Sequence, residues 1–261
     1  MGAAVFLDID GTIWDFDGNI PKSVAETLEK LYKNGHKAFI CTGRSRAMVR
    51  NEELLSLPLE GIIAACGTHI EIDGKMISED LLPFEKLSSF IKLLYDEDMP
   101  VILEGPVFNW MDPKDFSSDS YIEKVWNELG DCARQISDIK DGDKVNKFSA
   151  VITKTCDFEY VKEALKEDME LLIHGSHVFE AIPKGSGKAY GIKKLCSHLG
   201  ISHEDTYAIG DSINDVDMLS FAAHGIAMGN GTKEAKEAAD YVTTPLHDDG
   251  IANALLHYGL I

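Results

Sequence analysis

Four short segments of the sequence combine carboxylates, hydroxyls, glycines and cations at spacings that suit chemistry on a phosphate group. In the first, residues 6–13 read Phe-Leu-Asp-Ile-Asp-Gly-Thr-Ile, so that Asp8 and Asp10 directly follow an apolar run. Residues two apart on a strand point to the same face, and Gly11 lets the chain turn sharply beyond them. One carboxylate can attack phosphorus or hold a cation, while the other protonates the leaving oxygen and later activates water. Taken alone, the segment is also compatible with an acidic turn that caps a helix.

Two further segments carry groups that bind phosphate. Residues 38–44 read Ala-Phe-Ile-Cys-Thr-Gly-Arg, and the Thr42 hydroxyl with the backbone N–H groups around Gly43 can hold phosphate oxygens. Residues 184–188 read Lys-Gly-Ser-Gly-Lys before a predicted helix, which lets Lys188 offset phosphate charge. The alternatives are a polar loop with a helix N-cap for the first segment and a surface loop for the second.

The fourth segment, residues 207–215, reads Tyr-Ala-Ile-Gly-Asp-Ser-Ile-Asn-Asp and again brings carboxylates to the end of an apolar strand. Magnesium prefers octahedral oxygen ligands and keeps several waters, so a few carboxylates and a phosphate oxygen are enough to bind it. Asp211 suits a direct ligand and Asp215 a water-mediated one. Asn214 can donate a hydrogen bond to the phosphate.

The elements that must position these segments alternate between strand and helix. This alternation predicts a parallel, doubly wound α/β sheet in which the carboxyl ends of the strands share one edge. The predicted strands cover residues 3–8, 39–41, 62–66, 206–209 and 225–228, and a hairpin around Asp73-Gly74 covers 70–77. Helices are predicted up to residue 198, after 214 and, as a final pair, near the C-terminus.

The helix between the first two strands has a predicted start and stop. Ser23-Val24-Ala25-Glu26 has the pattern of a capping box, and Gly35 is typical of a helix end. The periodicity predicts that Leu28, Leu31 and Tyr32 face inward.

Residues 82–185 follow a different pattern, with helices near 85–95, 120–129 and 159–167 mixed with strands near 101–103, 146–152 and 170–173. None of the four segments lies within its body. We therefore predict one α/β domain, residues 1–81 and 186–261, interrupted by an α+β module, residues 82–185. Arg134 and Lys147 are candidate contacts from this module to an anionic or polyol substrate.

Composition limits the choice of partners and compartment. The formal net charge of −19 predicts repulsion from nucleic acid and anionic membranes, so an anionic substrate needs a pocket made positive by a metal ion, lysines and backbone amides. No apolar stretch is long enough to span a membrane, and the first residues do not predict a signal peptide. Five scattered cysteines without a C-x-x-C pair predict free thiols in a reducing cytoplasm. The oligomeric state is not indicated.

In combination and in this order, D-x-D-G-T, T-G-R, a lysine before a helix, and G-D-x-x-N-D resemble the haloacid dehalogenase superfamily of phosphatases. The long insertion and the ending Met228-Gly229 to Thr243 resemble its Cof-type subfamily. The resemblance covers essentially the whole chain. It implies a Rossmann-like core, an inserted cap of the C2B α+β type, and dependence on Mg²⁺.

The resemblance also implies a role for each matching residue. Asp8 is the nucleophile that becomes an aspartyl-phosphate, and Asp10 is the general acid and base. The residues implied to hold the phosphoryl group are Thr42, Gly43, Lys188 and Asn214. Those implied to hold Mg²⁺ are Asp8 and Asp211 through carboxylates, Asp10 through its backbone carbonyl, and Asp215 in support. The chain departs from the family at Cys66, where an Asn often stands before Gly67, which affects local substrate contacts and not the core chemistry.

The primary hypothesis is a phosphatase for small phosphorylated metabolites, with sugar phosphates favoured by the resemblance. A phosphomutase of the phosphomannomutase type is a second hypothesis, because the same motifs allow phosphate to return to the substrate. A non-catalytic binder that retains the fold is the third. Release of free phosphate without a bisphosphate activator separates the first from the second, and any turnover excludes the third.

Overall fold

The protein is described from a computed structural model that covers residues 2–116, 120–174 and 177–261, with the side chains of 120–124 left aside. The chain divides into two compact units. The first comprises Met1–Gly43, Arg50–Ser78 and Gly187–Ile261, and the second comprises Arg44–Val49 and Glu79–Ser186.

The short segment Arg44–Val49, predicted as part of the first unit, groups with the second. Its hydrogen bonds explain why. The Ser45 hydroxyl donates to Asn109 Oδ1 at 3.0 Å, and the Ala47 backbone N–H donates to the Gly105 carbonyl at 3.4 Å. The chain therefore enters the second unit directly after Gly43 and returns before the next strand.

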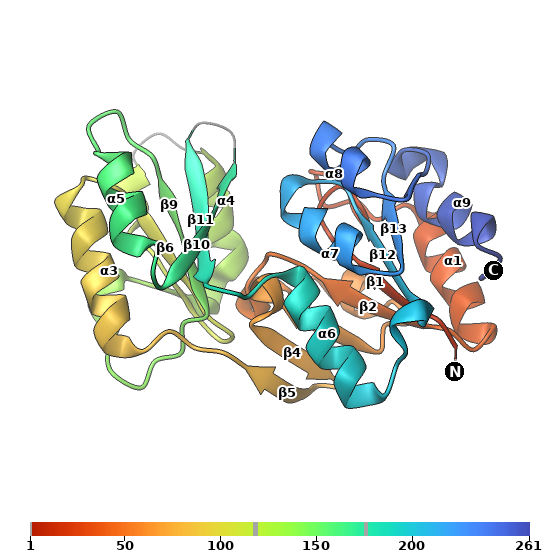
Figure 1. Ribbon diagram of the computed structural model, residues 1–261. Helices are drawn as coiled ribbons and strands as arrows, with labels where there is room; N and C mark the ends of the chain where they lie inside the picture. Colours follow the sequence, from red (N-terminus) through yellow and green to blue (C-terminus); the bar gives the residue numbers. More distant parts are fainter. Residues whose placement is uncertain (1, 117–119, 175–176) are drawn as a thin grey trace. The chain divides into compact units, whose positions relative to one another are not determined.

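The first unit is built on an eight-stranded sheet of order β14-β13-β12-β1-β2-β3-β4-β5 (Figure 1). All neighbours from β14 to β3 pair in parallel, while β3 and β4 pair antiparallel, which confirms the predicted doubly wound α/β fold. The strands are β1 (Ala4–Leu7), β2 (Lys37–Cys41), β3 (Gly61–Ala64), β4 (His69–Ile72), β5 (Lys75–Glu79), β12 (Thr206–Gly210), β13 (His224–Ala227) and β14 (Tyr241–Val242).

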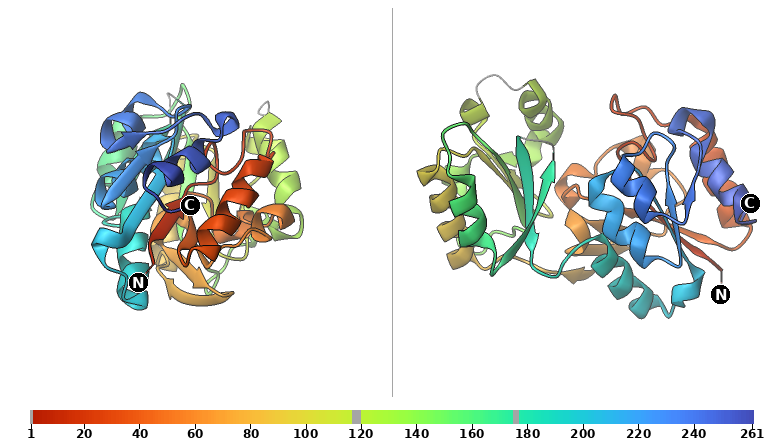
Figure 2. Two further views of the ribbon diagram at one scale, coloured as in Figure 1. Left: turned by 90° about the vertical axis from the view of Figure 1, so that its right-hand side faces the viewer. Right: turned by 45° about the horizontal axis from the view of Figure 1, so that its top comes forward.

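Helices cover both faces of this sheet. On one face, α6 (Lys188–Leu199), α7 (Val216–Phe221) and α8 (Lys233–Ala238) bury a cluster that includes Phe6 and Phe39, whose rings stack at 5.3 Å. On the other, α1 (Lys22–Lys33) and α9 (Gly250–His257) lie side by side (Figures 1 and 2). The short α2 (Glu52–Leu55) follows β2. Strand β1 is buried along its whole length, and Asp8, the residue after it, is only 3% exposed.

Two expectations for α1 were wrong. The helix begins at Lys22 after Pro21, and no side chain caps it, so Ser23 lies within the first turn and does not form a capping box. Tyr32 is 60% exposed, because the buried stripe runs through Val24, Thr27, Leu28 and Leu31. The predicted stop is in place, since the Gly35 N–H donates to the Tyr32 carbonyl at 3.0 Å.

The second unit contains a six-stranded sheet of order β10-β11-β9-β6-β7-β8. Its strands are β6 (Val101–Glu104), β7 (Asn109–Trp110), β8 (Ala133–Arg134), β9 (Lys147–Val151), β10 (Met169–His174) and β11 (Val178–Pro183). The helices α3 (Phe84–Asp96) and α5 (Phe158–Leu165) pack on one face, and α4 (Ser120–Leu129) lies on the other (Figure 1). Strands β7, β8 and β14 were not predicted, because a strand of two residues is too short to show a period. The six-residue β11 was not predicted either.

Candidate active site

Three of the four predicted segments meet where parallel strands end. Asp8 follows β1, Thr42 follows β2 and Asp211 follows β12. The register places Leu7 opposite Ile40 on one side and opposite Ile209 on the other. The residues that come next on these strands are therefore neighbours at one sheet edge, which is where open α/β sheets bind ligands.

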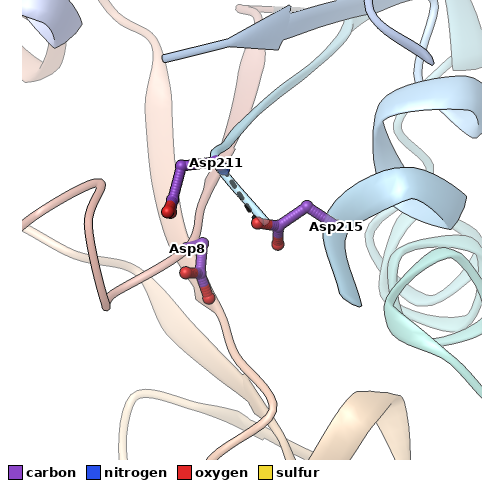
Figure 3. Close-up of side chains that lie close together, drawn as sticks. All are labelled: Asp8, Asp211 and Asp215. Atoms are coloured by element: carbon purple, nitrogen blue, oxygen red, sulfur yellow. Dashed lines mark hydrogen bonds between the residues drawn. The ribbon is translucent and has the colours of Figure 1, made fainter. Parts of the chain in front are cut away.

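The carboxylates of Asp8, Asp211 and Asp215 gather around one point (Figure 3). Each offers one oxygen, and these oxygens all lie within 4.8 Å of one another. The three residues are 3%, 6% and 0% exposed. Ionised carboxylates that lie so close together and are so poorly hydrated repel one another, so a cation bound among them would stabilise their ionised form.

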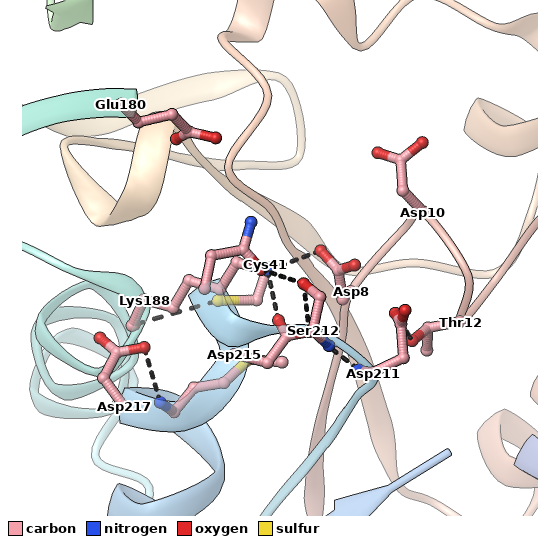
Figure 4. A network of polar contacts seen from close by, with 12 residues as sticks. Asp8, Asp10, Thr12, Cys41, Glu180, Lys188, Asp211, Ser212, Asp215 and Asp217 are labelled. Atoms are coloured by element: carbon pink, nitrogen blue, oxygen red, sulfur yellow. Dashed lines mark hydrogen bonds and ion pairs between the residues drawn. The ribbon is translucent and has the colours of Figure 1, made fainter. Parts of the chain in front are cut away.

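One cation of the protein already lies in this cluster. Lys188, the first residue of α6, has a fully buried side chain. Its Nζ donates to Asp8 Oδ1 at 2.6 Å and to Asp215 Oδ1 at 2.5 Å, as Figure 4 shows. A longer contact of 3.4 Å reaches Asn214 Oδ1. The lysine of the glycine-rich turn is thus brought to Asp8 of the first segment and to Asp215 of the last segment at once.

Asp215 is held by the loop that it follows. Its Oδ2 accepts the backbone N–H groups of Asp211 at 2.8 Å and Ser212 at 2.9 Å, while Oδ1 accepts from Lys188. The carboxylate therefore orients both the Asp211 loop and the ammonium group. A water-mediated contact from Asp215 to a metal ion stays a prediction.

Two hydrogen-bond donors that the sequence analysis did not assign hold the other carboxylates. The Thr12 hydroxyl donates to Asp211 Oδ1 at 3.0 Å, and the Trp14 indole N–H donates to Asp10 Oδ1 at 2.9 Å. Thr12 belongs to the D-x-D-G-T motif and could have been found from it. The contact of Trp14 with Asp10 could not be predicted from the motif, because it depends on how the loop after Gly11 folds back.

Thr42 and Gly43 are both buried beyond β2. The Thr42 N–H donates to the Ile63 carbonyl at 2.9 Å, and the Thr42 carbonyl accepts from Cys66 N–H at 3.1 Å. Cys66 is 1% exposed and has φ of 51° and ψ of 45°, the left-handed conformation. Asn adopts that conformation more readily than Cys, which gives a physical reason for the Asn that the resemblance leads us to expect at this point.

The electrostatics of the cluster are unbalanced. Burial, reinforced by the charge of Asp215, raises the pKa of Asp8 well above its usual range and the pKa of Asp211 to about 7. Burial alone would lower the pKa of Lys188, but Asp215 and Asp8 raise it, so the ammonium stays charged. When all three carboxylates are ionised, their charge exceeds that of the one ammonium by two. The donor set is all oxygen, and a divalent hard cation such as Mg²⁺ fits it in charge and in ligand type.

Comparison with known proteins identifies the family. The model of the haloacid dehalogenase-like hydrolase family matches residues 5–255. The chain belongs to this family. The match confirms the resemblance read from the four motifs and the prediction of an enzyme of the phosphatase type within this family.

Individual relatives span the whole chain. The protein YkrA of Bacillus subtilis (strain 168) is 31% identical over 257 residues, covering 98% of each chain. The 5-amino-6-(5-phospho-D-ribitylamino)uracil phosphatase YitU of the same organism is 28% identical over 268 residues, covering 97% of this chain and 96% of its own. Among solved structures, one of a HAD subclass IIB sugar phosphatase superposes with a TM-score of 0.83 at 29% identity, covering 99% of this chain and 100% of its own.

We expect Mg²⁺ to stabilise the protein more at pH 8 than at pH 6. The folded, metal-free protein binds the Asp211 proton more tightly than the unfolded chain, because the pKa of Asp211 rises from about 3.9 unfolded to about 7 folded. The stability of the metal-free protein therefore falls as the pH rises toward and past 7, and a bound cation removes that loss. Thermal unfolding with and without Mg²⁺ at both pH values measures the difference.

The matched control is Asp211→Asn, which removes this titrating group and should reduce the pH dependence of the Mg²⁺ effect, with the remainder coming from Asp8, whose pKa is also raised. An equal shift in melting temperature at pH 6 and pH 8 for the unaltered protein would contradict the expectation.

Proposed function

We propose that the chain is a Mg²⁺-dependent phosphomonoester hydrolase that acts through an aspartyl-phosphate on Asp8. The observation that carries the proposal is the contact of 2.6 Å between Lys188 Nζ and Asp8 Oδ1, within a buried cluster that also contains Asp211. An ammonium group at this distance favours the ionised form of Asp8, the form that can attack phosphorus, and so opposes the rise in pKa that burial causes.

In this proposal Mg²⁺ is held by the carboxylates of Asp8 and Asp211, with the Asp10 backbone carbonyl and, through water, Asp215 in support. When bound, the ion neutralises charge on the phosphate oxygens and on the two carboxylates. The negative excess of the cluster and the Thr12 hydrogen bond that orients Asp211 support this assignment.

The phosphoryl group is held by the remaining predicted residues. An ammonium group has three N–H donors, and in Lys188 two of them reach Asp8 and Asp215. The third, which faces Asn214 at 3.4 Å, turns to a phosphate oxygen when substrate is bound. The Thr42 hydroxyl, the backbone near Gly43 and the Asn214 side-chain amide complete the set.

The first chemical step forms the intermediate. A carboxylate oxygen of Asp8 attacks phosphorus, the bond between phosphorus and the ester oxygen breaks, and that oxygen takes a proton from Asp10. The products are aspartyl-phosphate, a free alcohol and an ionised Asp10. Because the transition state is loose, positioning and charge neutralisation contribute more than covalent assistance.

The second step regenerates the enzyme. Asp10, now ionised, takes a proton from a water molecule, and the resulting hydroxide oxygen attacks the phosphorus of the aspartyl-phosphate. Inorganic phosphate leaves, and Asp8 returns to a carboxylate. Asp10 thus serves as acid and then as base, which requires its carboxyl group to stay at one place in both steps.

For the substrate we propose a phosphate ester of a polyhydroxylated carbon chain, as in sugar phosphates. Two relatives support this class: one is a sugar phosphatase, and the other acts on a compound that carries a phosphoribityl chain. No helix within residues 2–116, 120–174 and 177–261 is long and apolar enough to cross a membrane. The cytoplasmic location and the lack of nucleic-acid partners stay predictions.

Asp8→Asn should abolish turnover and leave the fold intact. The amide keeps the size of the side chain but cannot attack phosphorus, so we expect kcat to fall by roughly 10³-fold or more. Phosphate release from p-nitrophenyl phosphate measures activity, and circular dichroism measures folding. The matched control is Asp17→Asn, which neutralises an exposed carboxylate in the following loop and should retain activity. Retained turnover in Asp8→Asn would remove the proposed nucleophile.

A hexose phosphate should yield free phosphate in the presence of Mg²⁺ alone. Hydrolysis needs no bisphosphate activator, whereas a phosphomutase would return the phosphoryl group to the sugar. Phosphate release and sugar isomers are followed together, with and without EDTA. Isomerised hexose phosphate without free phosphate would favour the mutase, and undiminished turnover in EDTA would exclude the proposed metal.

A further inference from the structure

The loop after the first strand folds back on itself and brings an indole ring to the second carboxylate. Gly11 has φ of +85°, and its N–H donates to the Trp14 carbonyl at 2.8 Å. The Trp14 N–H in turn donates to the Ile9 carbonyl at 3.1 Å. Trp14 is only 6% exposed, so its ring is fixed by packing, and its Nε1–H reaches Asp10 Oδ1 at 2.9 Å.

We propose that Trp14 is a positioning residue for Asp10, which it holds through the indole N–H so that proton transfer to the leaving group uses a preset geometry. The inference rests on the proposed function, because it concerns the acid and base of that reaction. It goes beyond the motifs, since neither the D-x-D-G-T pattern nor the predicted metal and phosphate ligands include this tryptophan.

The physical argument concerns rotation of the carboxyl group. The side chain of an aspartate has staggered χ1 positions and a broad χ2, so a carboxyl group near a loop turn samples several orientations. A hydrogen bond of 2.9 Å from a buried ring restricts both angles. Because Oδ1 accepts a hydrogen bond from the indole N–H, the proton that Asp10 exchanges with substrate is carried by Oδ2.

The effect of a correctly oriented Asp10 on the rate of the first step should be larger when the leaving group needs a proton in order to depart. In the first step the bond between phosphorus and the ester oxygen breaks while that oxygen takes the Oδ2 proton. An alcohol or phenol of high pKa leaves poorly without this proton, whereas p-nitrophenolate leaves as a stable anion. Loss of the indole N–H should therefore slow poor leaving groups selectively.

The test is Trp14→Phe, which keeps an aromatic ring in the site and removes the N–H. We expect kcat/KM for phenyl phosphate to fall by about tenfold, and kcat/KM for p-nitrophenyl phosphate by no more than about twofold. The ratio kcat/KM reports only the steps up to departure of the leaving group, so the second step does not obscure the comparison. The matched control is Trp126→Phe in the second unit, which should change neither ratio.

Equal losses for both esters would show that Trp14 has only a structural role, and no loss for either would show that the hydrogen bond is dispensable. Either result overturns the inference. In an Asp10→Ala background, Trp14→Phe should add no selective loss, because the group that it positions is gone. The proposed function fails separately, through retained activity in Asp8→Asn.

A second measurement does not depend on activity. The chain has three tryptophans, so an ¹H–¹⁵N spectrum of the metal-free protein shows three indole N–H signals, and Trp14→Phe identifies one of them. Asp10→Ala should move that signal upfield, since a hydrogen bond to a carboxylate shifts it downfield, and should leave the other two in place. A Trp14 signal that does not respond to Asp10→Ala would overturn the inference.

Discussion

The buried ammonium group of Lys188, in contact with Asp8 and Asp215, is the interaction on which the rest of the structure depends. Asp8 and Lys188 are 180 residues apart in sequence, and the lysine has no exposure to solvent. A buried charge is tolerated only when it is paired, and removing one partner of such a pair costs about 3–5 kcal/mol. The N-terminal and C-terminal segments of the first unit must therefore pack together to form the site. The second unit is inserted in the sequence between these segments.

Each charged residue of the site is positioned by a different element. Strand β1 brings Asp8, strand β12 brings Asp211, and helix α6 begins at the lysine that neutralises part of their charge. Parallel pairing on both sides of β1 places these ends at one edge. In the arrangement that we propose for catalysis, a divalent ion offsets the remaining negative excess and, together with Lys188, binds the phosphate.

Much of the fold and of the site could be predicted from the sequence, for a physical reason. The strands of a parallel sheet share their direction, so motifs that follow neighbouring strands must meet, and Asp8 and Asp211 do so. Lys188 joins them from the start of helix α6. What depends on tertiary packing could not be predicted. The contact between Trp14 and Asp10 is made by a loop turn, and the capping box at Ser23 fails because the helix begins two residues earlier than such a cap requires, at Lys22 after Pro21. Lys147, suggested as a substrate contact, is buried and paired with Glu104 at 2.7 Å and Glu180 at 3.1 Å.

The central claim is that one divalent ion and one phosphoryl group share the cluster around Asp8. Diffraction from crystals grown with Mn²⁺ and beryllium fluoride, recorded at the manganese absorption edge, tests it most directly. We expect one anomalous peak within bonding distance of the Asp8 and Asp211 carboxylates, and a beryllium fluoride adduct on Asp8 in contact with Lys188. A manganese peak bound elsewhere, or an adduct on a different residue, would contradict it.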